Sequence, residues 1–286
     1  MKAFTPFLLL GTQTVPIVAF LSRTPILLQT PRCSSSNLYS TSTKVIIQPV
    51  KDDPSSIAKV SSFMMDSFWT PLSQIDDPNG DYSTSSASYT SLTQVVKEDL
   101  DSRYGEIMGK RQLNSCLLGA FAETEEDDRL VGMVGVDVTL VDPSESILYT
   151  REDAETKLRN TVAALGPKQR REYKNASVCD IVQALLPNLN AVVVLTNLAV
   201  STTQRRMGVG KLLCQEVERL TKEEWEMDAL YLRVEAQNGA ARGLYESTLG
   251  YQEAWVESDA VALRANWESG VFEERTCETL SLVKSL

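Results

Sequence analysis

Apolar residues recur at two spacings along this chain: every second residue in some stretches, and every third or fourth in others. The first spacing is typical of strands with one buried face, and the second of amphipathic helices. The stretch 44–50 (KVIIQPV) is rich in β-branched residues, and Asp53 followed by Pro54 marks a helix start. In the first half these patterns predict a strand over 44–50, a helix over 53–68, a polar loop over 70–90, a helix over 92–107 and a hairpin with strands over 113–122 and 130–141.

Strands and helices alternate in the second half of the chain. Residues 191–200 (AVVVLTNLAV) form a strongly apolar stretch bounded by Asn190 and Ser201, which predicts a buried strand. The stretch 143–190 precedes it and is interpreted as an insertion. The order of elements predicts a mixed α/β sheet rather than a regular doubly wound one. After the buried strand we expect a helix over 208–225, a strand over 229–234, a helix over 238–249 that Gly250 ends, and closing strands over 251–256 and 276–283.

Residues 1–43 differ in composition from the rest of the chain. No Asp or Glu occurs before Asp52, and two short apolar runs are followed by a stretch rich in Ser, Thr and Pro. A signal-like segment joined to a transit-like segment at Ala19-Phe20 resembles the bipartite presequence of algae with complex plastids. We therefore predict a cleaved presequence over 1–43 and a plastid location, with a secreted or a mitochondrial protein as the alternatives. The apolar runs are too short and interrupted for a stable membrane anchor.

Composition narrows the chemistry that such a sheet could carry. The chain has a net charge of -10, 43% hydrophobic residues, 5 cysteines and no histidine. The absence of histidine excludes Ser-His-Asp and Cys-His catalysis and removes the usual metal ligand, and the scattered cysteines form no CxxC pair. We therefore predict no metal site. An acidic body also argues against nucleic-acid binding and suits a cationic partner, such as an amine or a basic peptide.

A glycine-bearing turn connects the buried strand to the helix that follows it. Gly208 and Gly210 lie where this helix begins, so its first amide groups have no helical partner and no side chain crowds them. Such a helix start can bind a diphosphate. A Walker phosphate loop is the sharper alternative, but Leu212 follows Lys211 where that loop has Ser or Thr. A dinucleotide fingerprint fails because Leu213 occupies the place of its third glycine, and a tight connection without a ligand is the remaining alternative.

Arg205-x-x-Gly208-x-Gly210 resembles the acetyl-CoA signature of the GNAT superfamily of N-acetyltransferases, Arg/Gln-x-x-Gly-x-Gly/Ala. It follows a strand that ends in Leu-Ala-Val, as the fourth strand of that family commonly does. The resemblance implies that the amides over 207–211 hold the pyrophosphate of acetyl-CoA, the co-substrate, and that the strand end pairs with its pantetheine arm. The coenzyme-binding residues that it implies are Leu198, Ala199, Val200, Arg205, Arg206, Met207, Gly208, Val209, Gly210, Lys211, Asn238 and Tyr245.

A second motif lies at 238–251. Asn238-Gly-Ala-Ala-Arg-Gly-Leu-Tyr245, followed by Leu249-Gly250-Tyr251, resembles the GNAT box Asn-x-x-Ala-x-x-Leu-Tyr…Leu-Gly-Phe/Tyr. The resemblance implies that Asn238 caps a helix and contacts the coenzyme, and that Tyr245 faces the thioester sulfur. A phenol is protonated at neutral pH and could protonate the leaving thiolate. The alternative is that Tyr245 is a core aromatic.

These motifs do not assign the general base. Bacterial ribosomal-protein enzymes of the superfamily carry a catalytic glutamate five residues before the box asparagine, and Arg233 occupies that place here. Glu235 shares its strand face and is the catalytic candidate, or else it pairs with Arg233. An α-amino group with a pKa of about 8 is partly neutral already, whereas a lysine at about 10.4 needs more help, so water alone could suffice for N-termini.

The resemblance implies a GNAT fold: an α/β (α+β) domain over 44–286 with a mixed sheet of six to seven strands, splayed between strands four and five. About four helices flank the sheet, and the insertion over 143–190 precedes strand four. It further implies direct acetyl transfer, without a metal, to protein N-termini or lysines, most like plastid and N-terminal (ribosomal-protein alanine type) enzymes. A small arylalkylamine or polyamine is the alternative acceptor. A non-catalytic acetyl-CoA-binding module is the alternative of another class.

Overall fold

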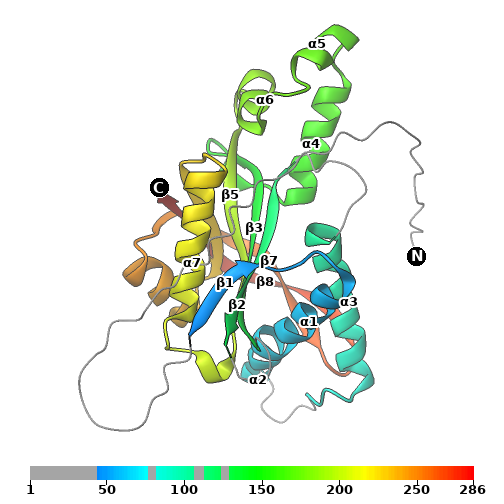
Figure 1. Ribbon diagram of the computed structural model, residues 1–286, viewed down its shortest axis with the longest axis vertical. Coiled ribbons are helices and arrows are strands. Elements are labelled where there is room, and N and C mark those ends of the chain that lie inside the picture. The colour runs from blue at the N-terminus through cyan, green and yellow to red at the C-terminus, as the bar shows by residue number, and fades with distance from the viewer. Residues whose placement is uncertain (1–43, 77–81, 106–112, 124–128) are drawn as a thin grey trace.

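An eight-stranded mixed sheet with helices on both faces forms the centre of the molecule (Figure 1). The computed structural model describes residues 44–76, 82–105, 113–123 and 129–286, so the predicted presequence lies outside the described residues. Seven strands follow the order β1-β2-β3-β5-β6-β8-β7, and β4 pairs with β3. Among the described strands, β5 and β6 form the only parallel pair. The strands are β1 (Val45–Pro49), β2 (Ser115–Ala122), β3 (Arg129–Asp142), β4 (Ile147–Leu148), β5 (Asn190–Val200), β6 (Ala229–Glu235), β7 (Gln252–Asn266) and β8 (Val271–Ser285).

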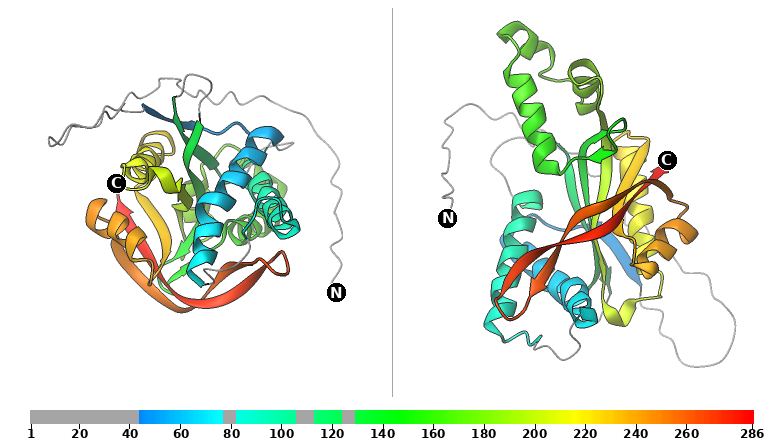
Figure 2. Two further views of the ribbon diagram at one scale, coloured as in Figure 1. Left: turned by 90° about the horizontal axis from the view of Figure 1, so that it is seen from below. Right: turned by 180° about the vertical axis from the view of Figure 1, so that it is seen from behind.

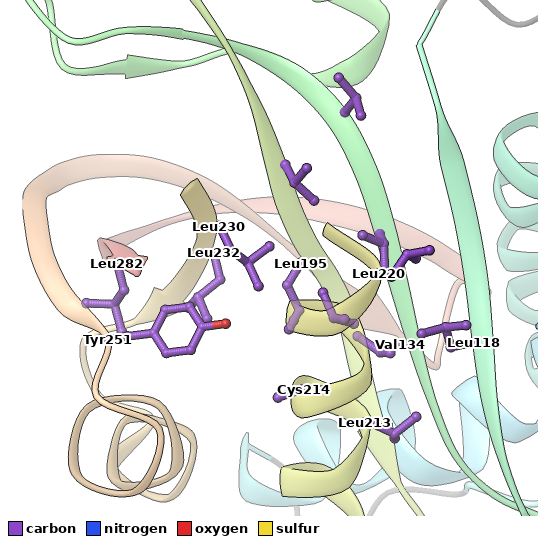
Figure 3. Packing of buried hydrophobic residues seen from close by; sticks show 14 of the residues in the cluster. Leu118, Val134, Leu195, Leu213, Cys214, Leu220, Leu230, Leu232, Tyr251 and Leu282 are labelled. Carbon is purple, nitrogen blue, oxygen red and sulfur yellow. The ribbon is translucent and has the colours of Figure 1, made fainter. Parts of the chain in front are cut away.

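Helices cover the two faces of the sheet unequally (Figure 2). On one face lie α1 (Pro54–Met64) and α3 (Ala87–Tyr104), which share one apolar cluster with β2 and β3. On the other face lies α7 (Val209–Arg219), which packs Leu213 and Val217 into the larger core. Figure 3 shows this larger core, in which Leu195 of β5 and Leu230 of β6 face α7. No helix in the described ranges is long and apolar enough to cross a membrane.

The predicted order of elements is confirmed, and the predicted helix start at 53–54 has the expected cap. The Asp53 carboxylate accepts hydrogen bonds from the amides of Ser55 and Ser56, each at 3.0 Å, and Pro54 takes the first helical position. The prediction of a loop over 70–90 is wrong at both ends. The helical chain continues from α1 through the π-helical segment η1 (Met65–Trp69) into α2 (Thr70–Asp76), and α3 begins at Ala87.

The closing hairpin is much longer than its predicted strands. β8 pairs with β6 only over 279–285, and from 260 to 277 the two hairpin strands pair with each other alone. This distal half reaches across to η1, which follows α1, and there the rings of Phe272 and Trp69 lie 4.8 Å apart (Figure 2). The sequence pattern did not predict this half, because apolar and polar residues do not alternate cleanly along either of its two strands.

The insertion stands out from the far end of the sheet (Figure 1). It contains α4 (Arg151–Ala163), α5 (Pro167–Glu172) and α6 (Val178–Leu185). Ala154 and Leu158 of α4 and Val182 of α6 are buried in the main core, whereas none of the residues of α5 is buried. Two helices therefore anchor the insertion, and the third forms its exposed tip.

A bulge in β5 shapes the centre of the sheet. Asn197 adopts a left-handed conformation with φ of 53°, and the register with β3 shifts there. Before the bulge, Val193 and Leu195 belong to the core that includes α7. After it, Leu198 and Val200 pack against that core, so the alternation of β5 has moved by one residue. β5 and β6 are the strands that the sequence analysis counted as four and five. They pair only over 193–195, so the predicted splay between them is confirmed.

Beside the bulge, a polar cluster crosses the α3 face of the sheet. The Tyr104 hydroxyl donates to the Asp137 carboxylate at 2.9 Å, and the Thr196 hydroxyl lies 3.4 Å from the same oxygen. Burial raises the pKa of the Asp137 carboxyl. Gly135 makes room for the cluster, because a Cβ there would overlap the Tyr104 hydroxyl and lie 2.5 Å from the Thr196 hydroxyl.

We expect Gly135→Ala to lower the free energy of unfolding by about 1–3 kcal/mol, as overpacking of a tight interior does. Urea denaturation of both proteins would measure the change. Gly166→Ala is the matched control, since a Cβ there would find its nearest atom at 3.8 Å. A Gly135→Ala protein as stable as the wild type would show that the cluster accommodates the added methyl group without loss of stability.

Candidate active site

The glycine turn places unpaired amides at the start of α7. Gly208 is the N-cap residue with φ of 88°, and no side chain caps the helix. The first helical hydrogen bond runs from the Leu212 amide to the Gly208 carbonyl at 3.0 Å. The amides of Val209, Gly210 and Lys211 therefore have no acceptor within the helix and point out of its end, where the helix dipole favours an anion.

Space is left in front of these amides. A Cβ on Gly208 would meet nothing within 4 Å, and the neighbouring Met207 is 58% exposed. On the inner side, a Cβ on Gly210 would lie 3.4 Å from Leu244 and 3.7 Å from Val200. The turn is thus open toward solvent and closed toward the sheet, as a diphosphate cradle requires. These residues fit the pyrophosphate of acetyl-CoA.

The end of β5 offers backbone groups beside this cradle. The Ser201 amide donates to the Val131 carbonyl of β3 at 2.9 Å. Because successive residues of an antiparallel pair face opposite ways, Val200 directs its own amide and carbonyl toward the gap that β6 leaves. This placement agrees with the predicted pairing of Val200 with an extended pantetheine arm, which itself stays a prediction.

Arg205 is the first residue of the turn, but its side chain points away from the amides of the cradle. Its Nη2 donates to the Ser67 carbonyl in η1 at 2.8 Å, and its Nε donates to the Val200 carbonyl at 3.3 Å. In this arrangement the Arg205 guanidinium is engaged elsewhere, so only the backbone of Arg205 is left for the predicted coenzyme contact. Arg206, next to it, is exposed with φ of 66°.

The second motif forms α8 (Gly239–Arg242) and the π-helical segment η4 (Gly243–Thr248). Asn238 caps α8 as predicted, because its side-chain oxygen accepts from the Ala241 amide at 3.1 Å. Tyr245 is 6% exposed, and its ring lies edge-on to that of Tyr251 at 5.9 Å. Burial raises the pKa of the Tyr245 phenol, so it stays protonated across the working pH range. Tyr245 is a core aromatic by burial, and its role as an acid stays a prediction.

A cleft of roughly 390 Å³ lies beside the bulge, between α1, α3 and the β7–β8 hairpin. Asn197 at the bulge of β5 and Glu235 at the end of β6 line it. The sequence analysis did not find this cleft, because its walls come from segments far apart in the chain. Its apolar wall includes Met64, Phe68, Trp69, Leu72, Leu263 and Phe272.

Charged residues in the cleft occur as acid–base pairs. Glu235 accepts from Arg264 of the hairpin at 2.6 Å, and Asp99 pairs with Arg103 within α3 at 2.9 Å. Arg233 does not pair with Glu235, because it binds both carboxylate oxygens of Glu257 at 2.9 Å. Glu235 is thus the carboxylate that the end of β6 presents to the cleft, where Arg264 holds it. In the described ranges no group of three His, Cys, Asp or Glu side chains forms a metal site.

Comparisons with known proteins identify a family for this chain. The model of the acetyltransferase (GNAT) family matches residues 87–251. No curated protein matches the chain. Similar solved structures include Arabidopsis thaliana NAA60 in complex with acetyl-CoA, at 16% identity over 85% of this chain and 98% of that chain, with a TM-score of 0.44. The acetyltransferase of GNAT family from Streptococcus pneumoniae is similar at 13% identity over 85% and 99%, with a TM-score of 0.44. The ribosomal-protein-S18-alanine N-acetyltransferase from Escherichia coli is similar at 12% identity over 84% and 93%, with a TM-score of 0.42.

We expect Gly208→Val to weaken acetyl-CoA binding by about 10- to 100-fold, because a β-branched residue at positive φ strains the backbone by about 1–3 kcal/mol or collapses the turn. Isothermal titration calorimetry would measure the affinity. Gly166→Val, at a helix-capping glycine with φ of -67° in the insertion, is the control and should bind normally. Unchanged affinity of Gly208→Val would remove the phosphate cradle from this turn.

Proposed function

The chain belongs to the acetyltransferase (GNAT) family and is an acetyl-CoA-dependent N-acetyltransferase, and we propose that its acceptors are protein N-terminal α-amino groups, with lysine ε-amino groups as weaker acceptors. The observation that carries this proposal is the cleft at the ends of β5 and β6, which joins an apolar, aromatic wall to the carboxylate of Glu235.

In this proposal, different backbone groups of the chain bind different parts of acetyl-CoA. Acetyl-CoA, when bound, supplies the acetyl group as a reactive thioester. The amides of Val209, Gly210 and Lys211 hold the pyrophosphate, and the backbone of Val200 aligns the pantetheine arm. Holding both substrates together supplies much of the rate, since effective molarities can reach about 10⁵ M or more. In this proposal the Val200 amide also polarises the thioester carbonyl.

The walls of the cleft suit the first residue of a polypeptide. Phe68, Trp69 and Phe272 offer ring surface to an apolar side chain, while Glu235 offers a carboxylate to the adjacent ammonium group. The volume is within the usual range for a small-ligand site. An arylalkylamine presents the same two groups, so it is the second candidate acceptor, and a polyamine would leave the aromatic wall uncovered.

The general-base chemistry favours α-amines over lysines. Arg233 stands where the related bacterial enzymes carry their glutamate, and an arginine bound to Glu257 accepts no proton. Glu235 is held by Arg264, and Asp99 by Arg103. An α-amine at a pKa of about 8 supplies its own neutral fraction at pH 7–8, whereas a lysine at about 10.4 depends on a base.

The plastid location also remains a proposal. Its support is the composition of residues 1–43 and the Ala19-Phe20 junction, together with the resemblance of the second motif to N-terminal acetyltransferases. Import would bring the enzyme to proteins made or processed inside the organelle.

Acceptor preference gives the direct test. We expect peptides with a free N-terminal Met, Leu or Phe to be acetylated with a higher kcat/KM than peptides starting with Ser or Gly, because only the former cover the aromatic wall. Mass spectrometry after incubation with acetyl-CoA would identify the modified nitrogen. N-terminally blocked peptides with one lysine, arylalkylamines and polyamines complete the panel.

In the same panel, Phe272→Ala should raise the KM for peptides with an apolar first residue and leave the KM for peptides that begin with Ser unchanged. Val261→Ala is the matched control, since Val261 is 63% exposed on the hairpin and does not line the cleft. Faster turnover of a small amine than of every peptide would overturn the proposal and establish the alternative acceptor.

Tyr245→Phe should lower kcat by about 100-fold and leave the acetyl-CoA dissociation constant within about twofold, because only the leaving thiolate needs the phenolic proton. Burial raises the pKa of the phenol, so we expect wild-type kcat/KM to rise through the amine pKa and stay level to about pH 10. Stopped-time assays over pH 6–10 would show the profile. Unchanged turnover in Tyr245→Phe would leave Tyr245 with a packing role alone.

A further inference from the structure

A proline in the helix that walls the cleft leaves one carbonyl without its usual partner. In an α-helix the Ser67 carbonyl would accept from the amide of residue 71, which is Pro71 and has no N–H. A proline ring also crowds the carbonyl four residues before it, and the chain widens into the π-helical segment η1 just there. Ser67 itself is 6% exposed. A carbonyl that lacks the amide four residues on can accept from a donor elsewhere in the chain.

Arg205 supplies that donor from a distant part of the chain. Its guanidinium reaches the Ser67 carbonyl at 2.8 Å, a contact between residues separated by 138 positions. Its Nε also holds the Val200 carbonyl at 3.3 Å, so one side chain joins η1 to the end of β5. A hydrogen bond from a charged donor is about twice as strong as a neutral one.

The two ends of this link belong to the two substrate sites. On one side, Arg205 begins the turn that carries the open amides of α7. On the other side, Phe68 and Trp69 directly follow Ser67 and line the cleft. A shift of Ser67 therefore moves two ring walls of the acceptor site, whereas the amide cradle is fixed separately by Gly208 and the helix.

We propose that Arg205 is a positioning residue, rather than a side-chain ligand of the coenzyme phosphates. It fixes the position of Phe68 and Trp69 in the cleft relative to the glycine turn at the start of α7. The inference rests on the proposed function, because it takes the cleft as the acceptor site. It gives the first arginine of the coenzyme motif a role in acceptor binding, exerted through Ser67, Phe68 and Trp69.

Arg205→Ala should raise the acceptor KM by about tenfold, the loss expected for a hydrogen bond from a charged donor. The acetyl-CoA dissociation constant, measured by calorimetry without acceptor, should stay within about twofold. Arg205→Lys keeps the charge but cannot donate to both carbonyls, so it should give an intermediate KM. Arg171→Ala in the exposed α5 removes the same charge far from the site and is the control. Arg205 is itself solvent-exposed, and thermal denaturation would verify that each variant is folded.

A double-mutant cycle with Pro71→Ala isolates the link. The substitution returns an N–H to the helix, where it can pair with the Ser67 carbonyl and replace Arg205. In the Pro71→Ala background, Arg205→Ala should therefore raise the acceptor KM by less than about threefold. An equal effect of Arg205→Ala in both backgrounds would overturn the inference.

Other outcomes separate the inference from the function it rests on. A rise in the acetyl-CoA dissociation constant as large as the rise in acceptor KM would make Arg205 a phosphate ligand and overturn the inference alone. An unchanged acceptor KM in Arg205→Ala would do the same. A wild-type protein that acetylates no peptide and no amine would instead refute the proposed function before any variant is compared.

Discussion

The left-handed conformation of Asn197 is the constraint on which the site depends. One extra residue in β5 ends its pairing with β6 after three residue pairs and turns the last part of the strand away from its neighbour. The backbone of Val200 then faces a gap instead of a strand. The same bulge places Asn197 itself in the wall of the cleft. A regular strand here would continue the pairing with β6 and close this gap in the sheet.

The elements that could be predicted from the sequence are those whose cause is local. The turn before α7 follows from glycines next to a buried strand, and Gly208 takes a positive φ of 88°, which glycine adopts more readily than residues with a Cβ. Asp53 and Asn238 cap their helices because a cap depends on residues two or three positions away. In these places the pattern contains the whole physical reason for the structure.

The cleft and its charge pairs could not be predicted in this way, because they depend on where distant segments meet. Glu235 lies next to Arg233 along its strand, yet it pairs with Arg264, which the long hairpin brings over the end of the sheet. Arg205 matched a coenzyme signature, but its side chain spans to Ser67. The sequence contains one signal for that contact, which becomes readable once the helix is seen to continue past residue 70: Pro71 cannot donate an amide to the carbonyl of residue 67. Such a signal shows that a donor is needed without showing which residue supplies it.

The position of the insertion explains why the fold tolerates it. It enters between β3 and β5, at the start of β5, whereas the bulge and the coenzyme turn lie at the other end of that strand. The 11 residues of β5 span roughly 35 Å at about 3.3 Å each, so the exposed helix α5 lies far from the coenzyme turn. The insertion is anchored through Leu158 and Val182, which are part of the main core. The bulge and the glycine turn, on which the proposed site depends, thus lie at one end of β5, and the insertion lies at the other.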